Sequence, residues 1–497
     1  MMSVFLRFFC IFFFSSIPFF SLAHAEKNQT FRFRLTEDMG TLDWNYGELN
    51  SEIVYQLMEG LFTADQLGRP EPAVAEYFSW SNNQTVITIY LRPNLYWSDG
   101  EPLCASDFVR SWERLKSKKF ASPYAHYANI IKKSEANSCN ELKVFLSRRA
   151  PEFPALLTHY VFFPLHKKVT EKLASKIFTN GVGIPVNGPF LVEAWEKNQK
   201  IVLARNHRYR EKIPEGAISK IETFFIPEDN TGLSFFEQKR IDWLKDISVL
   251  SRKKGLEKKL QFFPSLTAFY LGLNATSSTL LKDKNLRIAL SASLNREELA
   301  KVLGKEIQGT NIWLLPTFGI HGTKKMKQKQ KFIAIETAKK TFSKLVNENK
   351  FDLRLRIYNK NIHKLLAEWL QEQWRKKLGI LVPIDIQEEK VYWKEIISHP
   401  APIFLSGVTA PYNHPRAFLQ EFLSASSANW TGWKSSEYDK YVEQGKAYSA
   451  EKLLLNDGFV IPLYSRESVA LVQDGWRNFW INPLGQVYLK NIQFQSD

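Results

Sequence analysis

The region from residue 351 to residue 386 constrains the fold most, because the spacing of its apolar residues changes twice. A first strand is predicted by the alternating residues Phe351, Leu353, Leu355 and Ile357. After the polar turn 359–361, a helix ending near Gly379 is predicted by the apolar stripe of Ile362, Leu365, Leu366, Trp369 and Leu370. A second strand is predicted by Ile380, Val382, Ile384 and Ile386. This order predicts a right-handed βαβ crossover with a parallel sheet, and therefore an α/β fold.

Residues 85–115 predict another strand followed by a helix. Alternating apolar residues predict a half-buried strand over 85–91, which ends at the Arg-Pro-Asn turn 92–94. A short aromatic strand is predicted over 95–97. Ser106 and Asp107 can then cap a helix, and one face of that helix carries Phe108, Trp112 and Leu115.

The first 25 residues have the features of a secretory signal peptide. Arg7 supplies a positive charge, residues 8–20 are almost continuously apolar, and Ala23-His24-Ala25 offers small residues for cleavage. The apolar run is shorter than the roughly 20 residues that a membrane-spanning helix needs. We therefore expect residues 1–25 to be a signal peptide cleaved after Ala25, and the mature protein to be exported to the periplasm without stable membrane insertion.

The length and charge of the chain limit its class. A chain of 497 residues exceeds one ordinary core, so two or three domains are expected. The formal net charge of +16 suggests an anionic partner. The lysines are nevertheless scattered, and the densest run, residues 324–331, is typical of a solvated loop. No nucleic-acid partner is expected.

Two features bear on chemistry. Only Cys104 and Cys139 lie beyond the signal peptide, and an exported protein permits but does not require their pairing. No Gly-x-Ser-x-Gly elbow occurs, and none of the nine histidines forms a His-Glu-x-x-His pair. We therefore expect no catalytic residues, no metal site and no cofactor, with a secreted hydrolase as the rival class.

Short motifs in a fixed order give the chain a family resemblance. They include Glu59-Gly60-Leu61, the Gly-x-Pro-x-Pro-x-Val-Ala-Glu run 68–76, Trp97-Ser98-Asp99-Gly100, Ser111-Trp112, residues 186–190, Asn295-Arg296-Glu297 and Ile461-Pro462-Leu463-Tyr464. The set resembles the extracellular solute-binding proteins of peptide-type ABC transporters, family 5, particularly the oligopeptide-binding members.

The resemblance implies a type II periplasmic-binding-protein clamp, with two lobes, an extra inserted domain, and mixed sheets flanked by helices. The first lobe would comprise 26–58, 168–267 and 470–497, the inserted domain 59–167, and the second lobe 268–469. Such a protein captures an oligopeptide between its closing lobes and delivers it to an inner-membrane ABC permease. We expect a monomer. A binder of metal chelates or haem on the same fold is the alternative.

The resemblance also places an anchor for the ligand's amino end. The family motif Gly-Trp-x-Ala-Asp-Tyr-x-x-Pro-x-x-Phe-Leu matches residues 407–419, where the ligand-facing segment is Thr409, Ala410, Pro411, Tyr412 and Asn413. Family members bind the ligand's amine with the Asp, and Pro411 replaces it here. Without that carboxylate, a ligand ammonium group loses ~2–5 kcal/mol of binding free energy. Either another acid takes over, for which Asp246 is a candidate, or the ligand lacks a free amine, as some cell-wall-derived peptides would.

At the ligand's carboxyl end the match is closer. Residues 358–364 resemble the family's Tyr-Asn-x-x-x-x-His-Lys stretch with one residue fewer before the His, which implies that His363 approaches a ligand carboxylate, with Asn361 beside it. The first turn of the predicted helix also offers unpaired amides to an anion. His399, just before the strand that leads to the 407–419 motif, is a further cationic candidate.

Overall fold

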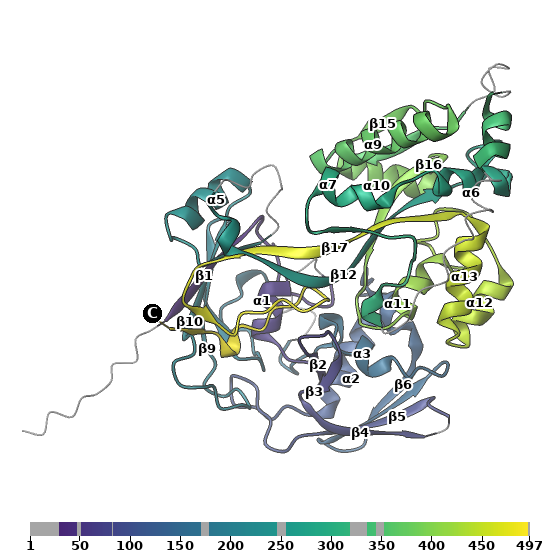
Figure 1. The fold of residues 1–497 in the computed structure, drawn as a ribbon. Helices are drawn as coiled ribbons and strands as arrows, with labels where there is room; N and C mark the ends of the chain where they lie inside the picture. Colours follow the sequence, from purple (N-terminus) through teal and green to yellow (C-terminus); the bar gives the residue numbers. More distant parts are fainter. Residues whose placement is uncertain are drawn as a thin grey trace, which may run out of the picture.

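The computed structural model describes residues 29–46, 51–81, 83–169, 178–245, 255–318, 335–343 and 352–495. An 11-stranded mixed sheet runs through the molecule (Figure 1). Its strand order is β15 (Ile384–Gln387), β14 (Leu355–Tyr358), β16 (Ile403–Thr409), β12 (Leu260–Leu273), β17 (Val460–Val472), β11 (Trp243–Lys245), β1 (Thr30–Leu35), β10 (Lys220–Phe225), β9 (Lys200–Arg205) and β8 (Phe190–Glu196). The short strand β13 (Ile307–Gly309) pairs with β17. We call the body around β1 the first lobe and the body around β14 the second lobe.

Strands β12 and β17 belong to both lobes. Residues 260–263 of β12 pair with 468–471 of β17 beside the first lobe. Residues 267–273 of β12 pair with β16 in the second lobe. The β12–β17 register shifts between Phe263 and Thr267, where Pro264 has no N–H to donate. We call this irregular stretch the hinge. The expected lobe limits at 267/268 and 469/470 fall in these strands, and the division into lobes stays a prediction.

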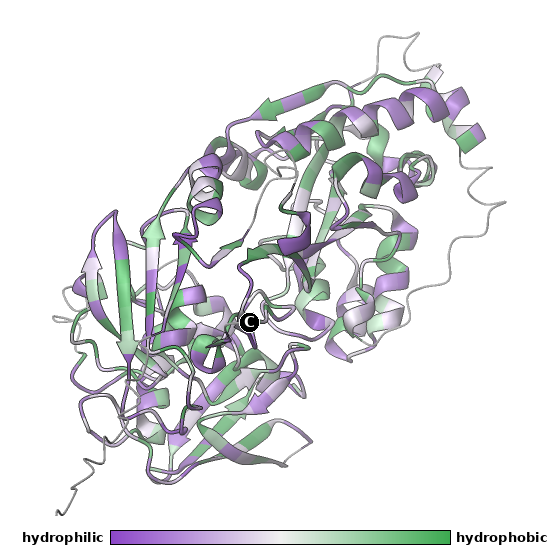
Figure 2. Cartoon of the chain, turned by 60° about the vertical axis from the view of Figure 1, so that its left-hand side comes forward, coloured by the Kyte–Doolittle hydropathy of each residue, from purple (hydrophilic) through white to green (hydrophobic). Residues whose placement is uncertain are grey.

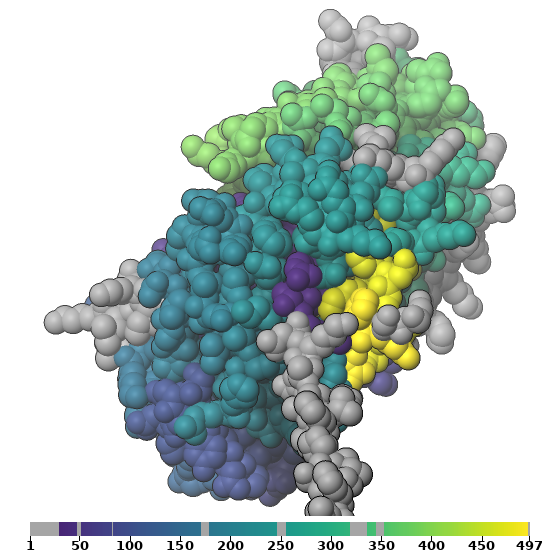
Figure 3. All heavy atoms as spheres, turned by 90° about the vertical axis from the view of Figure 1, so that its left-hand side faces the viewer, coloured from purple at the N-terminus to yellow at the C-terminus, as the bar shows by residue number. Residues whose placement is uncertain are grey.

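Segments far apart in sequence build the first lobe. β1 pairs in parallel with both β10 and β11. Phe31 and Phe33 are almost fully buried, and Phe31 meets Trp476 edge-on with 4.8 Å between ring centroids. Figure 3 shows the purple N-terminal strand between teal residues and the yellow C-terminal segment. The other elements of this lobe are α1 (Ser51–Leu57), α5 (Asp229–Glu237), β18 (Trp476–Arg477) and β19 (Gln493–Phe494).

An additional domain, which we call the inserted domain, packs below the first lobe in Figure 1. It contains a four-stranded antiparallel sheet in the order β4 (Ala75–Ser81), β5 (Val86–Leu91), β7 (Glu141–Leu146) and β6 (Ile131–Ala136), together with β2 (Phe62–Ala64), β3 (Pro70–Pro72), α2 (Ala105–Lys116) and α3 (Phe153–Leu156). The predicted strand and helix are confirmed as β5 and α2. The predicted strand over 95–97 is wrong, since Tyr96 forms only one isolated bridge. Left-handed residues at Asn94 and Gly100 confine this segment between two turns.

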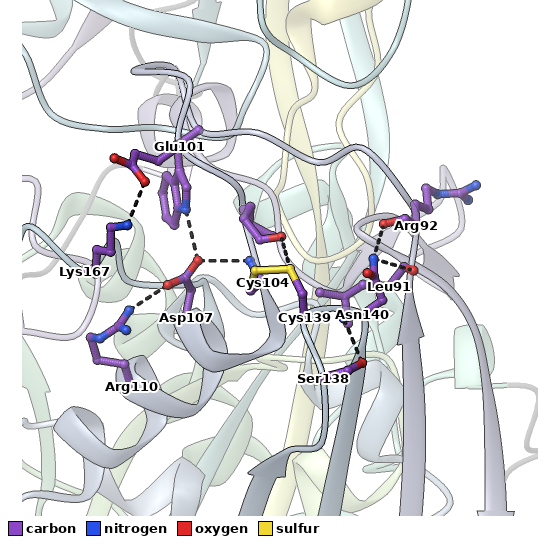
Figure 4. Close-up of a disulfide and its surroundings, with 12 residues drawn as sticks. Leu91, Arg92, Glu101, Cys104, Asp107, Arg110, Ser138, Cys139, Asn140 and Lys167 are labelled. Atoms are coloured by element: carbon purple, nitrogen blue, oxygen red, sulfur yellow. Dashed lines mark hydrogen bonds and ion pairs between the residues drawn. A yellow bond between two sulfur atoms is a disulfide. The ribbon is translucent and has the colours of Figure 1, made fainter.

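Cys104 and Cys139 form a disulfide at the start of α2 (Figure 4). Cys104, not Ser106, is the residue that precedes the helix. The carboxylate of Asp107 accepts hydrogen bonds from the Cys104 amide at 3.1 Å and from the Trp97 indole at 3.1 Å. Asp107 also pairs with Arg110 at 2.6 Å. The predicted capping role of Asp107 therefore holds, although it acts from inside the helix rather than before it.

The predicted strand, helix and strand of the second lobe are largely confirmed. β14 is followed by α9 (Asn361–Leu378), which ends at Gly379 with a φ of 72°, and β15 pairs with β14 in parallel. The second strand is shorter than predicted and begins only at Ile384, directly after Pro383. Ile380 and Val382 are buried without being part of the strand. Phe351 lies outside the described residues.

Helices cover the sheet of the second lobe. α6 (Lys284–Ala292), α7 (Leu299–Leu303), α9 and α10 (Glu389–Ser398) lie together in Figure 1, and α11 (Arg416–Leu419), α12 (Ser436–Glu443) and α13 (Ala447–Asp457) lie nearer the inserted domain. In Figure 2 the strands are rich in hydrophobic residues and the helices alternate between hydrophilic and hydrophobic residues, as amphipathic helices on a core do. No helix within the described ranges is both long and apolar enough to cross a membrane. The expected signal peptide lies outside these ranges.

Candidate ligand-binding site

The last part of β16 has an open edge. On one side, β16 pairs with β12 along its whole length, from Ile403 to Thr409. On the other side, β14 pairs only with Ile403 and Phe404. Among the described strands, none pairs with residues 405–409 on that side. Backbone groups on such an edge can form a ladder with an extended ligand.

The open edge ends at the hinge. Thr409 is exposed, and the amide of the next residue, Ala410, donates to the carbonyl of Leu266 at 2.8 Å. The Leu266 amide in turn donates to the carbonyl of Pro483 in the first lobe at 2.7 Å. Pro411 follows and is half-buried. The predicted ligand-facing segment therefore begins where the two lobes meet.

The next two predicted residues hold this segment in place. The Tyr412 side chain is buried, and its hydroxyl donates to the side-chain oxygen of Gln420 at 3.2 Å. The Asn413 amide donates to the carbonyl of Leu67 in the inserted domain at 2.9 Å. Tyr412 and Asn413 thus fix the loop after β16 against the turn that follows α11 and against the inserted domain.

Three side chains form a row across the sheet beside the hinge. Thr267 of β12 lies directly opposite both Thr409 of β16 and Arg466 of β17. Directly opposed residues in antiparallel strands share a face of the sheet. The two threonine hydroxyl oxygens are 3.0 Å apart. We call these three residues the hinge row. Thr409 belongs to the open edge of β16, and Thr267 and Arg466 follow one and two strands away across the sheet.

His363 is buried in the first turn of α9, with an exposed fraction of 2%. Its ring meets Tyr358 edge-on, with 4.1 Å between centroids, and lies 6.1 Å from the ring of Phe269. Its Nδ1 atom has no hydrogen-bond partner among the described residues. Burial, aided by the positive charge of Lys360, lowers the pKa of His363 to about 4. The imidazole is therefore neutral at physiological pH.

Charge and backbone geometry connect His363 with the hinge row. The positive charge of Arg466 opposes protonation of His363. The same charge favours ionisation of Tyr358 and Tyr464. The residue before α9, Lys360, makes no side-chain cap to the helix, and Asn361, its first residue, is exposed. The structure thus brings His363, Asn361 and Arg466 to one end of the second-lobe sheet, near Thr409.

The two remaining predicted candidates are not part of this group. His399 ends α10 and precedes β16, so it lies at the opposite end of that strand from Thr409. Its ring is exposed, with Nδ1 at 3.0 Å from the hydroxyl of Ser398. Asp246 lies outside the described residues.

An ion-pair network joins the inserted domain to the second lobe. Arg148 pairs with the buried Glu152 at 2.5 Å, and Arg416 pairs with Glu443 at 2.6 Å. Longer pairs cross between the two units, from Arg416 to Glu152 at 3.8 Å and from Arg148 to Glu443 at 3.9 Å. These residues and His414 line a cavity of about 290 Å³. The charges in this cavity are mutually satisfied, so the network serves mainly to hold the two units together.

Sequence reasoning missed two charged groups, Arg466 of the hinge row and Glu421. Arg466 follows the Ile-Pro-Leu-Tyr motif by two residues, and a cation inside a largely apolar strand was a usable signal. Glu421 is half-buried in the 3₁₀ turn Gln420–Phe422 after α11. Burial raises the pKa of Glu421 to about 7. Nothing in the sequence around Glu421 marks its surroundings, because they come from other segments.

Metal coordination has no obvious location in the described part of the chain. There, no group of three or more His, Cys, Asp or Glu side chains is arranged to hold a metal ion. The polar groups at the hinge are hydroxyls, backbone amides and one guanidinium. This set is suited to binding backbone and carboxylate groups of an organic ligand.

Two lobes joined by shared strands, with polar groups gathered at the joint, define a solute-binding protein of the clamp type. The chain belongs to the bacterial extracellular solute-binding proteins of family 5, whose model matches residues 69–430. This family consists of binding proteins, so the chain is not an enzyme.

Relatives and solved structures agree with this assignment. The periplasmic oligopeptide-binding protein OppA of Salmonella typhimurium is 29% identical, over 90% of this chain and 88% of its own length. The probable deoxycholate-binding periplasmic protein YgiS of Escherichia coli is 27% identical, over 94% of both chains. A crystal structure of Haemophilus influenzae OppA in complex with the peptide RPPGFSPFR matches with a TM-score of 0.76 and 24% identity, over 95% of this chain and 99% of that chain. The predicted clamp fold is therefore confirmed.

Proposed function

We propose that this chain is the solute-binding subunit of an ABC transport system and that it captures peptides between its two lobes. The observation that carries the proposal is the open edge of β16 at residues 405–409, which ends at the hinge. An extended peptide can add to this edge as a strand and gain backbone hydrogen bonds without regard to its side chains. Relatives named for oligopeptide binding support the same ligand class.

The location and partners follow from the same proposal. The apolar N-terminal segment and the periplasmic relatives support export, with cleavage after Ala25. The subunit would then deliver its ligand as a monomer to an inner-membrane permease. Residues Thr409, Ala410, Pro411, Tyr412 and Asn413 would border the ligand, with His363 and Asn361 toward its carboxyl end.

The ligand's carboxylate would be bound at the hinge row. The guanidinium of Arg466 and the hydroxyls of Thr267 and Thr409 are donors to a carboxylate. His363 lies behind them, with one nitrogen unpartnered. Arg466 would supply the charge, whereas the neutral His363 would supply a hydrogen bond or position the neighbouring rings.

Replacing His363 with alanine tests its part. We expect peptides with a free carboxyl end to bind about tenfold more weakly, which matches the loss of one hydrogen bond to a charged group. C-terminally amidated peptides should change little. Because the pKa of His363 is lowered to about 4, its charge is constant from pH 6 to 8, and the loss should be the same across that range. Calorimetry measures both peptide types. Equal losses for free and amidated peptides would assign His363 a purely structural role.

Pro411 favours a second candidate ligand class. A carboxylate ligand that lacks a free amine would not need the missing Asp. Two kinds of ligand fit this description: a cell-wall-derived peptide with an unusual amino end, and a molecule such as deoxycholate, for which one relative is named. Native mass spectrometry of the protein purified from its own periplasm separates the candidates by the mass of the retained ligand. Masses of ordinary free-amine peptides support the main proposal, and a single mass of an amine-blocked peptide or of a non-peptide carboxylate would replace it with the second.

A further inference from the structure

Two arginine–glutamate pairs meet where the inserted domain touches the second lobe. Arg148 and Glu152, which directly precedes α3, belong to the inserted domain and pair at 2.5 Å. Arg416 of α11 and Glu443 of α12 belong to the second lobe and pair at 2.6 Å. The pairs that cross between the units are longer, at 3.8 Å from Arg416 to Glu152 and 3.9 Å from Arg148 to Glu443. We call these four residues the latch.

The latch can separate without leaving a charge unpaired. If the second lobe moves away, Arg148 keeps Glu152 and Arg416 keeps Glu443, because the short pair of each arginine lies within its own unit. This matters most for Glu152, whose side chain is only 3% exposed and which would be costly to bury without a counter-charge. Of the four ion pairs, only the two long ones are lost. The contact is therefore attractive and still able to open.

The contact between the inserted domain and the first lobe is built differently. The carboxylate of Glu59, at the start of the inserted domain, pairs with Arg210 at 2.5 Å and accepts a hydrogen bond from the Tyr209 hydroxyl at 2.8 Å. Within the described ranges, no cation of the inserted domain pairs with Glu59, so separation would leave a largely buried carboxylate without a counter-charge. The Ser98 amide also donates to the carbonyl of Val186 at 2.8 Å. The inserted domain is therefore fixed to the first lobe, and the latch is the contact that can open.

The latch is close in sequence and in space to the segment that is predicted to face the ligand. Asn413 ends that segment and donates to the carbonyl of Leu67 in the inserted domain at 2.9 Å. Arg416 follows three residues later, at the start of α11. In Figure 1, α11 and α12 lie on the side of the second lobe that faces the inserted domain. Contact at the latch thus also brings the loop after β16 against the inserted domain.

We propose that the latch closes and opens with the clamp, and that its two long ion pairs favour the closed arrangement and so raise the affinity for the ligand. The effect on affinity rests on the proposed capture of peptides between the lobes, whereas the opening of the latch can be observed without any ligand. The Arg148–Glu443 pair is partly exposed, with side-chain exposures of 25% and 48%. Salt should therefore weaken the latch.

Distances between two spin labels test the opening of the latch in the ligand-free protein. One pair of labels, on Lys132→Cys in β6 and Lys440→Cys in α12, spans the latch. A second pair, on Lys132→Cys and Lys212→Cys, joins the inserted domain to the first lobe. All three lysines are exposed. Raising NaCl from about 0.02 M to about 0.5 M should shift the first pair to longer distances and leave the second pair unchanged.

The variant Glu443→Arg tests the charges themselves, with Glu437→Arg as the matched control. Both residues are exposed on α12, so the two substitutions change the net charge equally on the same helix. Glu443→Arg places a third cation beside Arg148 and Arg416. At low salt, the fraction of molecules with the short distance across the latch should fall about two- to fivefold. Glu437→Arg should leave this fraction unchanged.

Peptide affinity connects the latch with capture. The probe is a mixture of tri- to pentapeptides of random sequence with free amino and carboxyl ends, titrated by calorimetry. Glu443→Arg should weaken binding about two- to fivefold at low salt and less than about twofold at high salt, where the latch of the wild type is already screened. Glu437→Arg should match the wild type at both salt concentrations.

The outcomes separate this proposal from peptide capture. If neither salt nor Glu443→Arg changes the distance across the latch, the latch is overturned while peptide capture stands. Lengthening of the distance between the inserted domain and the first lobe would also overturn it. A latch that opens as expected without any change in peptide affinity would overturn its effect on the ligand. Failure of the wild-type protein to bind the mixture would overturn peptide capture and that effect together, whereas the label distances would still decide whether the latch opens.

Discussion

Replacing Cys104 and Cys139 together with serine is expected to lower the free energy of unfolding of the inserted domain by about 3–4 kcal/mol. The disulfide closes a loop with a sequence separation of 35 residues, and constraining a loop of this length in the unfolded chain accounts for a change of that size. The bond also fixes the start of α2, whose Phe108 and Trp112 are fully buried. Urea unfolding followed by tryptophan fluorescence measures the change.

Reduction of the wild-type protein provides the control for this prediction. Dithiothreitol should lower the stability of the wild type by a similar amount and leave the double serine variant unchanged. Peptide affinity under native conditions should be unaffected, since the disulfide lies at the start of α2 and not beside β16. A loss below 1 kcal/mol, or no effect of reduction, would show that the domain is held together without the disulfide.

The variant Arg466→Ala should lose about 2 kcal/mol of binding free energy for peptides with a free carboxyl end, or roughly 30-fold in affinity. The value lies at the lower end of the range for charged pairs because Arg466 is only half-buried and solvent screens its charge. Amidated peptides, which carry no charge at that end, should lose threefold at most. Calorimetry with one peptide in both forms measures the difference.

Two further variants sharpen this test. Arg354 is exposed just before β14, at the end of that strand away from Tyr358, so Arg354→Ala removes a positive charge from the same lobe without touching the hinge row. It should leave both affinities unchanged. Arg466→Lys keeps the charge but not the planar fork and should fall between wild type and alanine. If Arg354→Ala and Arg466→Ala weaken binding equally, the effect is one of net charge, and the hinge row is not a carboxylate site.

Local patterns predicted much of the fold because they reflect local causes. The change in the spacing of apolar residues around 355–386 predicted α9 and the parallel strands beside it, since an amphipathic helix and a buried strand each require a different spacing of apolar residues. The errors occurred where backbone constraints outweighed the apolar pattern. Pro383 delayed the start of β15, and turns at Asn94 and Gly100 prevented a strand over 95–97.

The candidate site was less predictable, because its residues are gathered from separate segments. The hinge row requires the pairing of Thr267 with Thr409 and Arg466, and no local pattern specifies strand order across such distances in sequence. The environment of Glu421 depends in the same way on Tyr127, which belongs to another domain.

The central claim is that the ligand is captured between two lobes, which close about β12 and β17. Small-angle X-ray scattering with and without peptide is the most direct test of this claim. A saturating free-amine peptide mixture should lower the radius of gyration of the wild-type protein, because a ligand held by both lobes favours the closed arrangement. The complex is verified in the same sample by native mass spectrometry. A radius of gyration that does not change although peptide is bound would contradict capture by closure.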